Sequence, residues 1–288
     1  MTVSVIITTF NRPNKVINAI DSVLNQKHQA QEIIVVNDGD ILEGFDYHII
    51  FNHIILINNI DSRGANFSRN RGASLATGDI LMFLDDDDTW ESKKIKNQLR
   101  IFKDSPQVGL VYSNRNVVDD SGKLLRTIHS TKSGCLYPDI LFKNLIGTTS
   151  SVAIKRDIFN FVGGFDVNLP ALQDYDVWIR VCKVCLIGLD TEFTVNYTSS
   201  SNSILQLSGS AFKKIAAVNY IKDKYSMEIL NLSFIQRCKV YSSLQLSISR
   251  SYRGTSYYKS ALYAVKSFLY YPNFKALFFL LPRFFIKI

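Results

Sequence analysis

The sequence contains few cysteines, no long apolar run and no leader-like N-terminus. Four cysteines in 288 residues are too few for the disulfide framework of a secreted domain. No uncharged apolar stretch approaches the roughly 18 residues that a membrane-spanning helix requires. Met1–Phe10 lacks the basic region and the small-residue cleavage site of a signal peptide. The sequence therefore predicts a cytoplasmic protein.

The composition predicts a folded protein with a sizeable core. Hydrophobic residues make up 47% of the chain and aromatic residues 12%, which excludes general disorder. A chain of 288 residues is long enough for one large α/β domain, or for one domain with an appendage.

Basic charge is concentrated in the last part of the chain. Residues 209–288 contain 13 Lys or Arg and only two acidic residues, so they carry a net charge of +11, whereas the rest carries −3. Such a basic segment can be a solvated surface, a nucleic-acid patch or a patch for an anionic membrane. The many aromatic and aliphatic residues of this segment favour the membrane, and no nucleic-acid-binding motif is present.

Strand-like and helical patterns alternate over the first 115 residues. Short runs rich in Val and Ile predict strands at Val3–Thr8, Glu32–Asn37, Ile54–Asn58, Ile80–Leu84 and Leu110–Ser113. Apolar periodicity predicts helices at Pro13–Asn25, Asn66–Ala76 and Thr89–Lys103. This alternation is typical of βαβ units and a mainly parallel sheet, whose ligands bind at the carboxyl ends of the strands.

The pattern is less regular after residue 115. A turn is predicted at Asp119–Gly122, a strand at Thr148–Ile154 and a helix from Asp174 to about Cys185. Gly163 and Gly164 interrupt the chain between the last two. The Ser-rich stretch Thr198–Ser210 is the candidate linker between the acidic body and the basic tail.

Four consecutive aspartates, Asp85 to Asp88, follow the predicted strand Ile80–Leu84. Adjacent carboxylates repel one another unless a cation lies among them. In an extended segment Asp85 and Asp87 point the same way, and two such oxygen ligands suit Mg²⁺ or Mn²⁺. The alternative is a solvated turn that caps the next helix, since Asp88 and Glu91 have the spacing of a capping box. We therefore predict Asp85 and Asp87 as metal ligands and Asp88 as a helix cap.

The motifs together resemble a known enzyme family. Val3–Pro13, Glu32–Asp38, Arg69–Gly72 and Leu84–Asp88, in that order, are similar to segments of the family 2 glycosyltransferases with the GT-A fold. The resemblance covers roughly residues 2–205. It implies an α/β fold with a Rossmann-like, mainly parallel sheet flanked by helices, followed by a C-terminal helical tail. It also implies that Asp85 and Asp87 hold Mn²⁺ or Mg²⁺ on the diphosphate of a nucleotide-sugar donor.

The resemblance also implies a domain division and a donor site. Residues 1–208 would form the catalytic domain, with a nucleotide-sugar half (1–115) and an acceptor half (116–208), and 209–288 a basic amphipathic helical region. In the family, the residue matching Asp38 hydrogen-bonds the uracil or ribose, although Asp38 also suits an Asp-Gly turn. Arg69 matches an Arg-Asn pair of the family. Arg12, Arg63 and Arg71 could equally be surface residues or contacts to the diphosphate or the aspartates. The donor-binding residues implied are Thr9, Phe10, Asp38, Arg69, Asp85 and Asp86.

A second pair of motifs implies the catalytic base. Gly163–Asp166 followed by Gln173–Arg180 resembles the family's Gly-Gly-Phe-Asp segment and its Glu-Asp-x-Asp-x-Trp-x-Arg segment. The family's general base then corresponds to Asp174, while Gln173 replaces the usual Glu, so any role of that carboxylate is lost.

Helical spacing independently places Asp174 on the apolar face of its predicted helix, where it is a site residue or an N-cap. Asp176 lies off that face and is predicted to be structural. The pair Cys182 and Cys185 lies on the apolar face and is predicted to be core packing rather than a zinc site.

The resemblance implies an inverting, hexosyltransferase-like enzyme that transfers a sugar from a UDP-sugar to an acceptor hydroxyl. Such an enzyme would act in the synthesis of cell-surface polysaccharide or glycolipid, on a saccharide or lipid-linked saccharide. One alternative is a sugar-phosphate nucleotidyltransferase, although Thr8–Asn14 lacks the glycine-rich phosphate loop of that class. The other is a catalytically inactive, membrane-associated scaffold.

The tail contains two amphipathic helical patterns. The first comprises Tyr258, Ala261, Leu262, Val265, Phe268 and Leu269, with Lys259 and Lys266 off the apolar stripe. The second follows Pro272 and comprises Phe274, Leu277, Phe278, Leu281 and Phe285, interrupted by Pro282. We predict that these helices bind the anionic inner face of the cell membrane. Alternatively, they pack on the catalytic domain.

Overall fold

The computed structural model describes residues 1–40, 53–199 and 211–280. These residues form two compact units. The first comprises Met1–Tyr137, Leu145–Val167 and Val177–Ser201, and the second Pro138–Asn144, Asn168–Asp176 and Asn202–Ile288. The predicted domain boundary at residue 208, and most of the predicted linker, lie outside the described residues.

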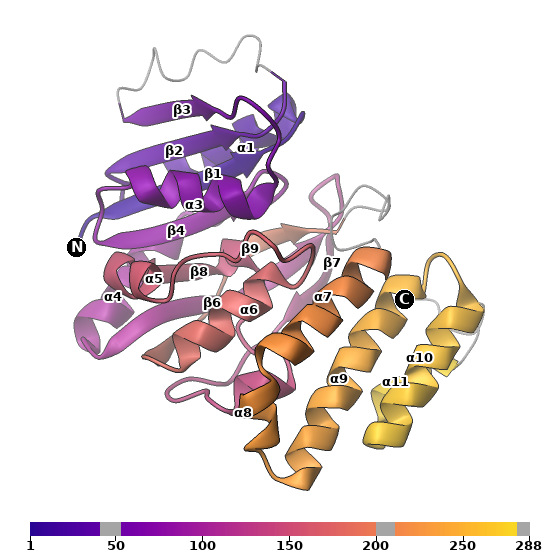
Figure 1. Ribbon diagram of the computed structural model, residues 1–288. Helices are drawn as coiled ribbons and strands as arrows, with labels where there is room; N and C mark the ends of the chain where they lie inside the picture. The colour runs from indigo at the N-terminus through magenta and orange to yellow at the C-terminus, as the bar shows by residue number, and fades with distance from the viewer. Residues whose placement is uncertain (41–52, 200–210, 281–288) are drawn as a thin grey trace. The chain divides into compact units, whose positions relative to one another are not determined.

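The first unit is built on a mixed sheet whose first half is parallel (Figure 1). Strands β3 (Ile54–Asn58), β2 (Glu32–Asn37), β1 (Val3–Thr9) and β4 (Ile80–Asp85) are parallel neighbours in that order. Figure 1 shows α3 (Ala65–Leu75) in front of these strands and α1 (Pro13–Leu24) behind them. Helices on both faces explain why β1 and β2 are buried at every position. The predicted strands and helices of this region are confirmed.

The second half of the sheet contains antiparallel pairs. Strand β8 (Val152–Lys155) is antiparallel to β4 and to β6 (Val108–Val118), whereas β9 (Leu186–Thr198) is parallel to β6. Two shorter strands, β5 (Thr89–Trp90) and β7 (Leu124–Ile128), pair with β9 and β6. The predicted class, α/β with a largely parallel sheet flanked by helices, is confirmed.

Tertiary pairing moves two of the predicted boundaries. Thr89–Trp90 was expected to begin a helix, but it is β5, and α4 runs only over Lys94–Asp104. The predicted capping box of Asp88 and Glu91 is therefore wrong, since α4 has Lys93 as its N-cap and no side-chain cap bond. The predicted strand Thr148–Ile154 begins as the 3₁₀ turn η2 (Thr149–Ser151) and becomes extended only in β8.

Asn70 on α3 fastens the glycine-rich segment that follows α5 (Arg156–Phe161). Its side-chain amide donates to the carbonyl of Phe165 at 2.7 Å and accepts from the Phe165 amide at 2.8 Å. Gly164 has a φ of +64°, and a Cβ there would lie 2.6 Å from Asn70 Oδ1. Glycine is therefore required at Gly164 both by the backbone conformation and by the close approach of Asn70.

The second unit is largely helical. It contains η1 (Asp139–Phe142), the start of α6 (Gln173–Cys182), α7 (Ala211–Lys224), α8 (Ser226–Leu230), α9 (Phe234–Tyr252), α10 (Tyr257–Tyr270) and α11 (Phe274–Leu280). The helices predicted from the two amphipathic patterns of the tail correspond to α10 and α11. Residues Leu281, Pro282 and Phe285 of the second pattern lie outside the described residues.

Serines hold α9 and α10 together. The hydroxyl of Ser249 donates to the Ser260 carbonyl at 2.8 Å, and that of Ser260 donates to the Ser249 carbonyl at 3.0 Å. Seven residues away on each helix, Ser267 donates to the Ser242 carbonyl at 2.8 Å. These small side chains let the two backbones approach closely and satisfy their own hydroxyls. Within the described parts of the chain, no helix is long and apolar enough to cross a membrane.

Asp176, at the start of α6, is a structural residue of the second unit. It was predicted to lie off the apolar stripe of its helix and to be structural, and its full burial supports a structural role. The Tyr225 hydroxyl donates to its carboxylate at 2.8 Å, and the Lys224 ammonium lies 2.8 Å from the same oxygen. This ion pair and hydrogen bond fasten α6 to the C-terminal end of α7, whose last residue is Lys224, and to Tyr225 that follows it.

We predict that Asn70→Ala destabilises the first unit. The substitution leaves the buried N–H and C=O of Phe165 without partners, and each unpaired group costs about 1–3 kcal/mol. Urea unfolding should show the loss, with Ser74→Ala at an exposed position of the same helix as the matched control. Equal unfolding midpoints for the two variants would contradict the pinning role of Asn70.

Candidate active site

Polar residues gather where the parallel strands end. In the register of the sheet Thr9 pairs with Asn37, and Thr8 pairs with Asp85. The carboxyl ends of β1, β2 and β4 are therefore adjacent, and Asp38 directly follows β2. As expected for a parallel sheet, the first unit brings Thr9, Asp38 and the aspartates at the end of β4 to one edge.

Asp85 is held by residues from two other segments. Its Oδ1 lies 2.5 Å from the guanidinium of Arg69 on α3, and its Oδ2 accepts a hydrogen bond of 3.0 Å from the Thr149 hydroxyl. The backbone amide of Asp85 donates to the Ser150 hydroxyl at 3.2 Å. Arg69 and Asp85, both predicted as donor-binding residues, are thus direct partners.

Arg12 pairs with the next two aspartates. Its guanidinium lies 3.0 Å from Oδ1 of Asp86 and 3.0 Å from Oδ2 of Asp87. Asp86 also accepts a hydrogen bond of 2.8 Å from the Thr9 hydroxyl. The sequence alone does not distinguish a surface role from a phosphate contact for Arg12, whereas the structure places it against the acidic loop.

Burial and mutual repulsion disfavour the ionised carboxylates of this loop. Burial raises the pKa of Asp86 to about 6, although Arg12 and Thr9 oppose the rise. Burial and the nearby charge of Asp85 raise the pKa of Asp87 as well. A divalent cation between Asp85 and Asp87 would relieve this repulsion.

The residues present fit such a cation only if other ligands complete its shell. No group of three or more His, Cys, Asp or Glu suited to a metal occurs within residues 1–40, 53–199 and 211–280. Two carboxylates nevertheless match the way Mg²⁺ is commonly held, by one or two acidic side chains with water and phosphate oxygens as the rest.

Asp88 connects the acidic loop to β9. It is fully buried and accepts a hydrogen bond of 2.9 Å from the amide of Thr198, at the end of β9. Its Oδ2 is buried and has no hydrogen-bond partner. Burial and the charges of Asp87 and Asp85 raise its pKa well above the usual range. Asp88 therefore joins two strand ends, which explains why it is not available as the cap of α4.

A supporting layer beneath the loop was not predicted. Trp90 Nε1 donates to the carbonyl of Ser150 at 2.9 Å, and the Lys94 ammonium donates to that of Ser151 at 3.0 Å. Lys94 is fully buried, and burial lowers its pKa to about 7. These two contacts fix η2, whose Thr149 and Ser150 hold Asp85. The signal in the sequence was the run of hydroxyl residues before β8, which only the fold brings to the acidic loop.

Asp38 is already well supplied with hydrogen-bond donors. It is buried and accepts from the amides of Arg63 and Gly64 at 2.9 and 2.7 Å, and from Asn59 and Ser62 at 2.5 and 3.0 Å. Burial alone would raise the pKa of Asp38, but these four bonds lower it. Asp38 thereby fastens the segment between β3 and α3 to the end of β2. Its contact with the nucleotide stays a prediction.

The other residues considered for binding the nucleotide-sugar differ in their exposure to solvent. Thr9 is buried, whereas Phe10 is 53% exposed beside it. Arg71 donates to the carbonyl of Asn58 at 3.0 Å, and the Arg63 guanidinium lies 3.9 Å from the centre of the Phe67 ring. Arg71 and Arg63 therefore have structural partners of their own, while Arg69 points to the acidic loop.

Asp174, the predicted general base, belongs to the second unit. It is half-buried in the first turn of α6, which begins one residue earlier, so it is not the N-cap. The Asn144 amide donates to its Oδ2 at 2.9 Å. Lys214 on α7 is close enough for the charge of Asp174 to raise its pKa, although burial has the larger effect and lowers it. The sequence did not predict Asn144 or Lys214 as neighbours of Asp174.

The apolar face of α6 is confirmed as core. Val177, Trp178 and Val181 are fully buried, and Cys182 is nearly so. Burial raises the pKa of the thiols of Cys182 and Cys185, which disfavours the thiolate that zinc binding requires. Packing therefore accounts for both cysteines.

Three comparisons identify relatives of this chain. Residues 4–163, more than half of the chain, match glycosyl transferase family 2. An uncharacterised glycosyltransferase of Haemophilus influenzae is 26% identical over 77% of this chain and 76% of its own length. A Haloferax volcanii protein named glucosyl-dolichyl phosphate glucuronosyltransferase is 28% identical over 65% of this chain and 63% of its own. The chain spans only 33% of a longer relative from Rickettsia felis.

The fold is also that of solved structures. The chain resembles S. aureus TarS 1–349, crystallised with UDP-GlcNAc, with a TM-score of 0.58 at 13% identity over 94% of this chain and 90% of that one. That likeness concerns the fold, whereas the match over residues 4–163 concerns the sequence. The chain therefore belongs to glycosyl transferase family 2 and is a nucleotide-sugar glycosyltransferase with the GT-A fold.

Proposed function

We propose that the chain transfers a sugar from a UDP-sugar to a hydroxyl of a saccharide or lipid-linked saccharide, with inversion at the anomeric carbon. The observation that carries this proposal is the acidic loop at the carboxyl ends of β1, β2 and β4, with two arginines in contact with it. The TarS structures with UDP and UDP-GlcNAc support a UDP-sugar. The name of the Haloferax volcanii relative supports a lipid-linked acceptor. Synthesis of a cell-surface polysaccharide or glycolipid is the setting that fits both.

Arginine side chains would bind the diphosphate of the donor. Arg69 uses its terminal nitrogen for Asp85, while its Nε is buried and has no hydrogen-bond acceptor. A phosphate oxygen would satisfy that donor through a charge-assisted hydrogen bond. Arg12, about one-third exposed, would add a second positive charge beside Asp86 and Asp87. Membership of family 2 is at odds with the nucleotidyltransferase alternative.

Asp85 and Asp87 would hold a Mn²⁺ or Mg²⁺ ion. When bound, the ion would neutralise charge that develops on the departing nucleoside diphosphate. The raised pKa of Asp87 supports this assignment, because an ion would favour the ionised form that the site otherwise disfavours. Thr149 and Ser150, anchored through Trp90 and Lys94, would keep Asp85 in place.

Asp174 would act as the general base. It would take the proton of the acceptor hydroxyl while the hydroxyl oxygen attacks the anomeric carbon and the bond from that carbon to the diphosphate oxygen breaks. The hydrogen bond from Asn144 would orient the carboxylate. Lys214 on α7 lies close enough to interact electrostatically with this carboxylate. No covalent intermediate is required.

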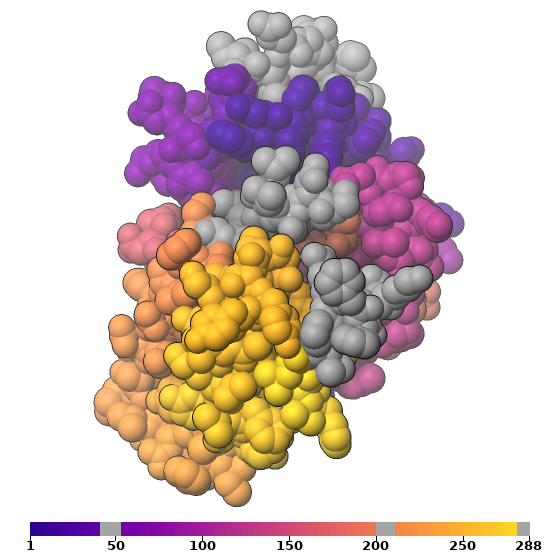
Figure 2. Space-filling view, turned by 90° about the vertical axis from the view of Figure 1, so that its right-hand side faces the viewer, coloured from indigo at the N-terminus to yellow at the C-terminus, as the bar shows by residue number. Residues whose placement is uncertain are grey.

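The helical tail would hold the enzyme against an anionic membrane, on its cytoplasmic face. One face of α10 exposes Tyr258, Leu262, Val265 and Leu269, and Phe274 of α11 is 91% exposed. Figure 2 shows the surface of these last helices in orange and yellow. Lysines on the same helix, Lys259 and Lys266, would be attracted to anionic lipids by about 1 kcal/mol each.

Removal of one metal ligand should abolish donor binding. We expect Asp87→Asn to eliminate sugar transfer and the Mn²⁺-dependent binding of UDP, measured by calorimetry, while the circular dichroism spectrum stays unchanged. Asp104→Asn, at the exposed end of α4, is the matched control and should bind UDP normally. Full transfer activity in excess EDTA would show that the metal assignment is wrong.

Loss of the base should affect turnover rather than affinity. We expect Asp174→Asn to lower the turnover number about 10²-fold or more, with the Kd of UDP nearly unchanged. Asp223→Asn, at an exposed position of α7 in the same unit, should retain full turnover. If UDP affinity collapses together with turnover, Asp174 has a structural role and the assignment fails.

Negative charges on the exposed face of α10 should prevent membrane binding. We expect the double variant Leu262→Glu/Val265→Glu to lose flotation with phosphatidylglycerol vesicles, because it removes apolar contacts and repels anionic lipid. Leu124→Glu/Leu125→Glu, on exposed positions of β7, is the matched control and should still float. Equal flotation of both double variants, or none by the unmodified protein, would refute the anchor.

A further inference from the structure

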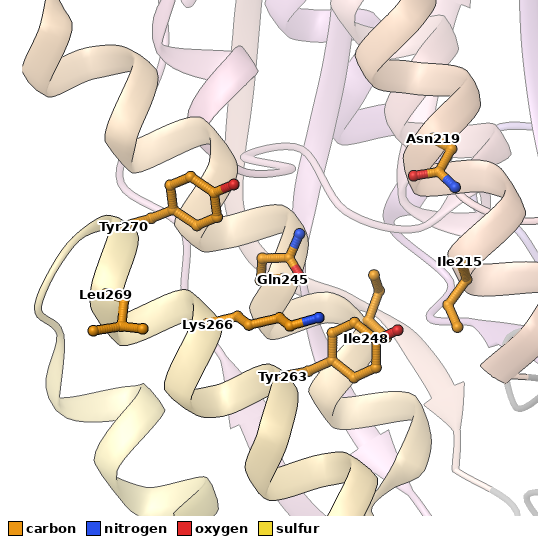
Figure 3. Close-up of a pocket in the computed structure, with 8 residues that line it drawn as sticks. All are labelled: Ile215, Asn219, Gln245, Ile248, Tyr263, Lys266, Leu269 and Tyr270. Carbon is orange, nitrogen blue, oxygen red and sulfur yellow. The ribbon is translucent and has the colours of Figure 1, made fainter.

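The helices of the second unit form an open pocket that the proposed reaction does not use. It has a volume of about 540 Å³ and is lined by side chains of α7, α9 and α10. Figure 3 shows Gln245 of α9 near the centre, Tyr270 of α10 at upper left, Tyr263 beside Ile248 below the centre, and the α7 residues Ile215 and Asn219 at right. This volume falls in the range of small-molecule sites.

Gln245 supplies the sharpest information about the ligand. Its Oε1 is buried and has no hydrogen-bond partner, and the residue lines the pocket. A buried amide oxygen without a donor is unfavourable and uncommon in native structures. The ligand must therefore bring a donor, such as a hydroxyl group. A phosphate or carboxylate offers only acceptor oxygens and would be repelled by Gln245 Oε1.

The walls of the pocket combine flat rings with aliphatic side chains. The Tyr263 ring is stacked on Tyr252 with centroids 5.8 Å apart and an interplanar angle of 9°, and the Tyr270 ring lies 5.4 Å from that of Tyr241. These partners hold the two rings in place. Ile215 and Ile248 add apolar surface, and Asn219 adds a second amide. Aromatic rings can pack against the C–H groups of a sugar, and amides can hydrogen-bond its hydroxyls. The pocket combines both kinds of side chain, which suits a sugar.

Lys266 is the lysine among the pocket-lining residues. Its ammonium lies 5.0 Å from the centre of the Tyr263 ring, a cation–π contact that positions the side chain and leaves its charge unchanged. Figure 3 shows the side chain extending towards Tyr263. The N–H groups of this ammonium can donate to the hydroxyl oxygens of a ligand.

Helix α7 links the pocket to the candidate base within the second unit. Lys214 on this helix is close enough to sense the charge of Asp174, and the next residue, Ile215, lines the pocket together with Asn219. The unit that carries the base thus also carries the pocket. A ligand held there would belong to the acceptor, because the base acts on the acceptor hydroxyl.

We propose that this pocket binds a neutral, hydroxyl-rich saccharide segment of the acceptor, outside the sugar that receives the transfer. The acceptor assignment rests on the proposed function, whereas saccharide binding itself does not. The enzyme would then prefer acceptors of several sugars over single sugars.

Saccharide binding can be measured without donor or metal. The full-length protein would be titrated with maltotetraose, chitotetraose and a galactose tetrasaccharide, with saturation-transfer NMR as the readout. We expect at least one of them to bind and Gln245→Met to weaken that binding about fivefold or more, since a hydrogen bond is lost without a cavity. Gln107→Met, at an exposed position of the first unit, is the matched control and should bind as the unmodified protein does.

A second readout separates a binding role from a structural one. Because Met removes an unpaired buried oxygen and fills the same space, Gln245→Met should not lower the Tm. If the variant nevertheless unfolds early, Tyr263→Leu provides an independent test of the same site, with exposed Tyr258→Leu as its control.

The outcomes distinguish this inference from the proposed function. Binding of none of the three tetrasaccharides, or equal binding by the pocket variants and their controls, overturns the inference and leaves sugar transfer unaffected. If Gln245→Met changes flotation with anionic vesicles and not saccharide binding, the pocket is a lipid site and the inference is wrong. Saccharide binding in a chain that transfers no sugar would instead refute the proposed function alone.

Discussion

The repulsion among Asp85, Asp86, Asp87 and Asp88 is the constraint around which the first unit is arranged. These carboxylates are partly or fully buried at the end of β4, where charges of one sign are strongly unfavourable. Arginines from two segments lie against them, Arg69 on Asp85 and Arg12 on Asp86 and Asp87. Burial in the first place, and the neighbouring carboxylates in the second, raise the pKa values of Asp86 and Asp87, and the arginines compensate only in part. The site is thus prepared for further positive charge.

The position of Asp85 also depends on two side chains that do not contact the carboxylates of the acidic loop. Trp90 and Lys94 hold the backbone of η2, and η2 in turn holds Asp85. A buried lysine is tolerated here because its ammonium donates to the Ser151 carbonyl and to Gln98. A short β5 and an η2 turn, rather than a longer helix and strand, are the local structures that permit this arrangement.

In the second unit, the packed helices are rich in serine, and their hydroxyl groups need hydrogen-bond partners. Ser242 and Ser249 of α9 face Ser267 and Ser260 of α10, so the polar atoms satisfy one another inside the interface. The larger apolar side chains of Tyr258, Leu262, Val265 and Leu269 lie on the exposed face of α10. The same helices leave one buried amide oxygen, that of Gln245, without a donor.

Local pattern was sufficient for the parallel half of the sheet, the alternating helices and the acidic metal-ligand candidates. Strands such as Glu32–Asn37 are buried on both faces, and their continuous apolar runs are therefore visible without any knowledge of the fold. Contacts between distant segments decided the rest: β5 exists because Thr89 and Trp90 pair with Asn196 and Val195. Asp88 accepts a hydrogen bond from the amide of Thr198, and α4 begins later in the chain than the sequence pattern predicts. The neighbours of Asp174 come from the residues after η1 and from α7. Such contacts join segments that are far apart in the sequence. The local periodicity of the sequence therefore cannot predict them.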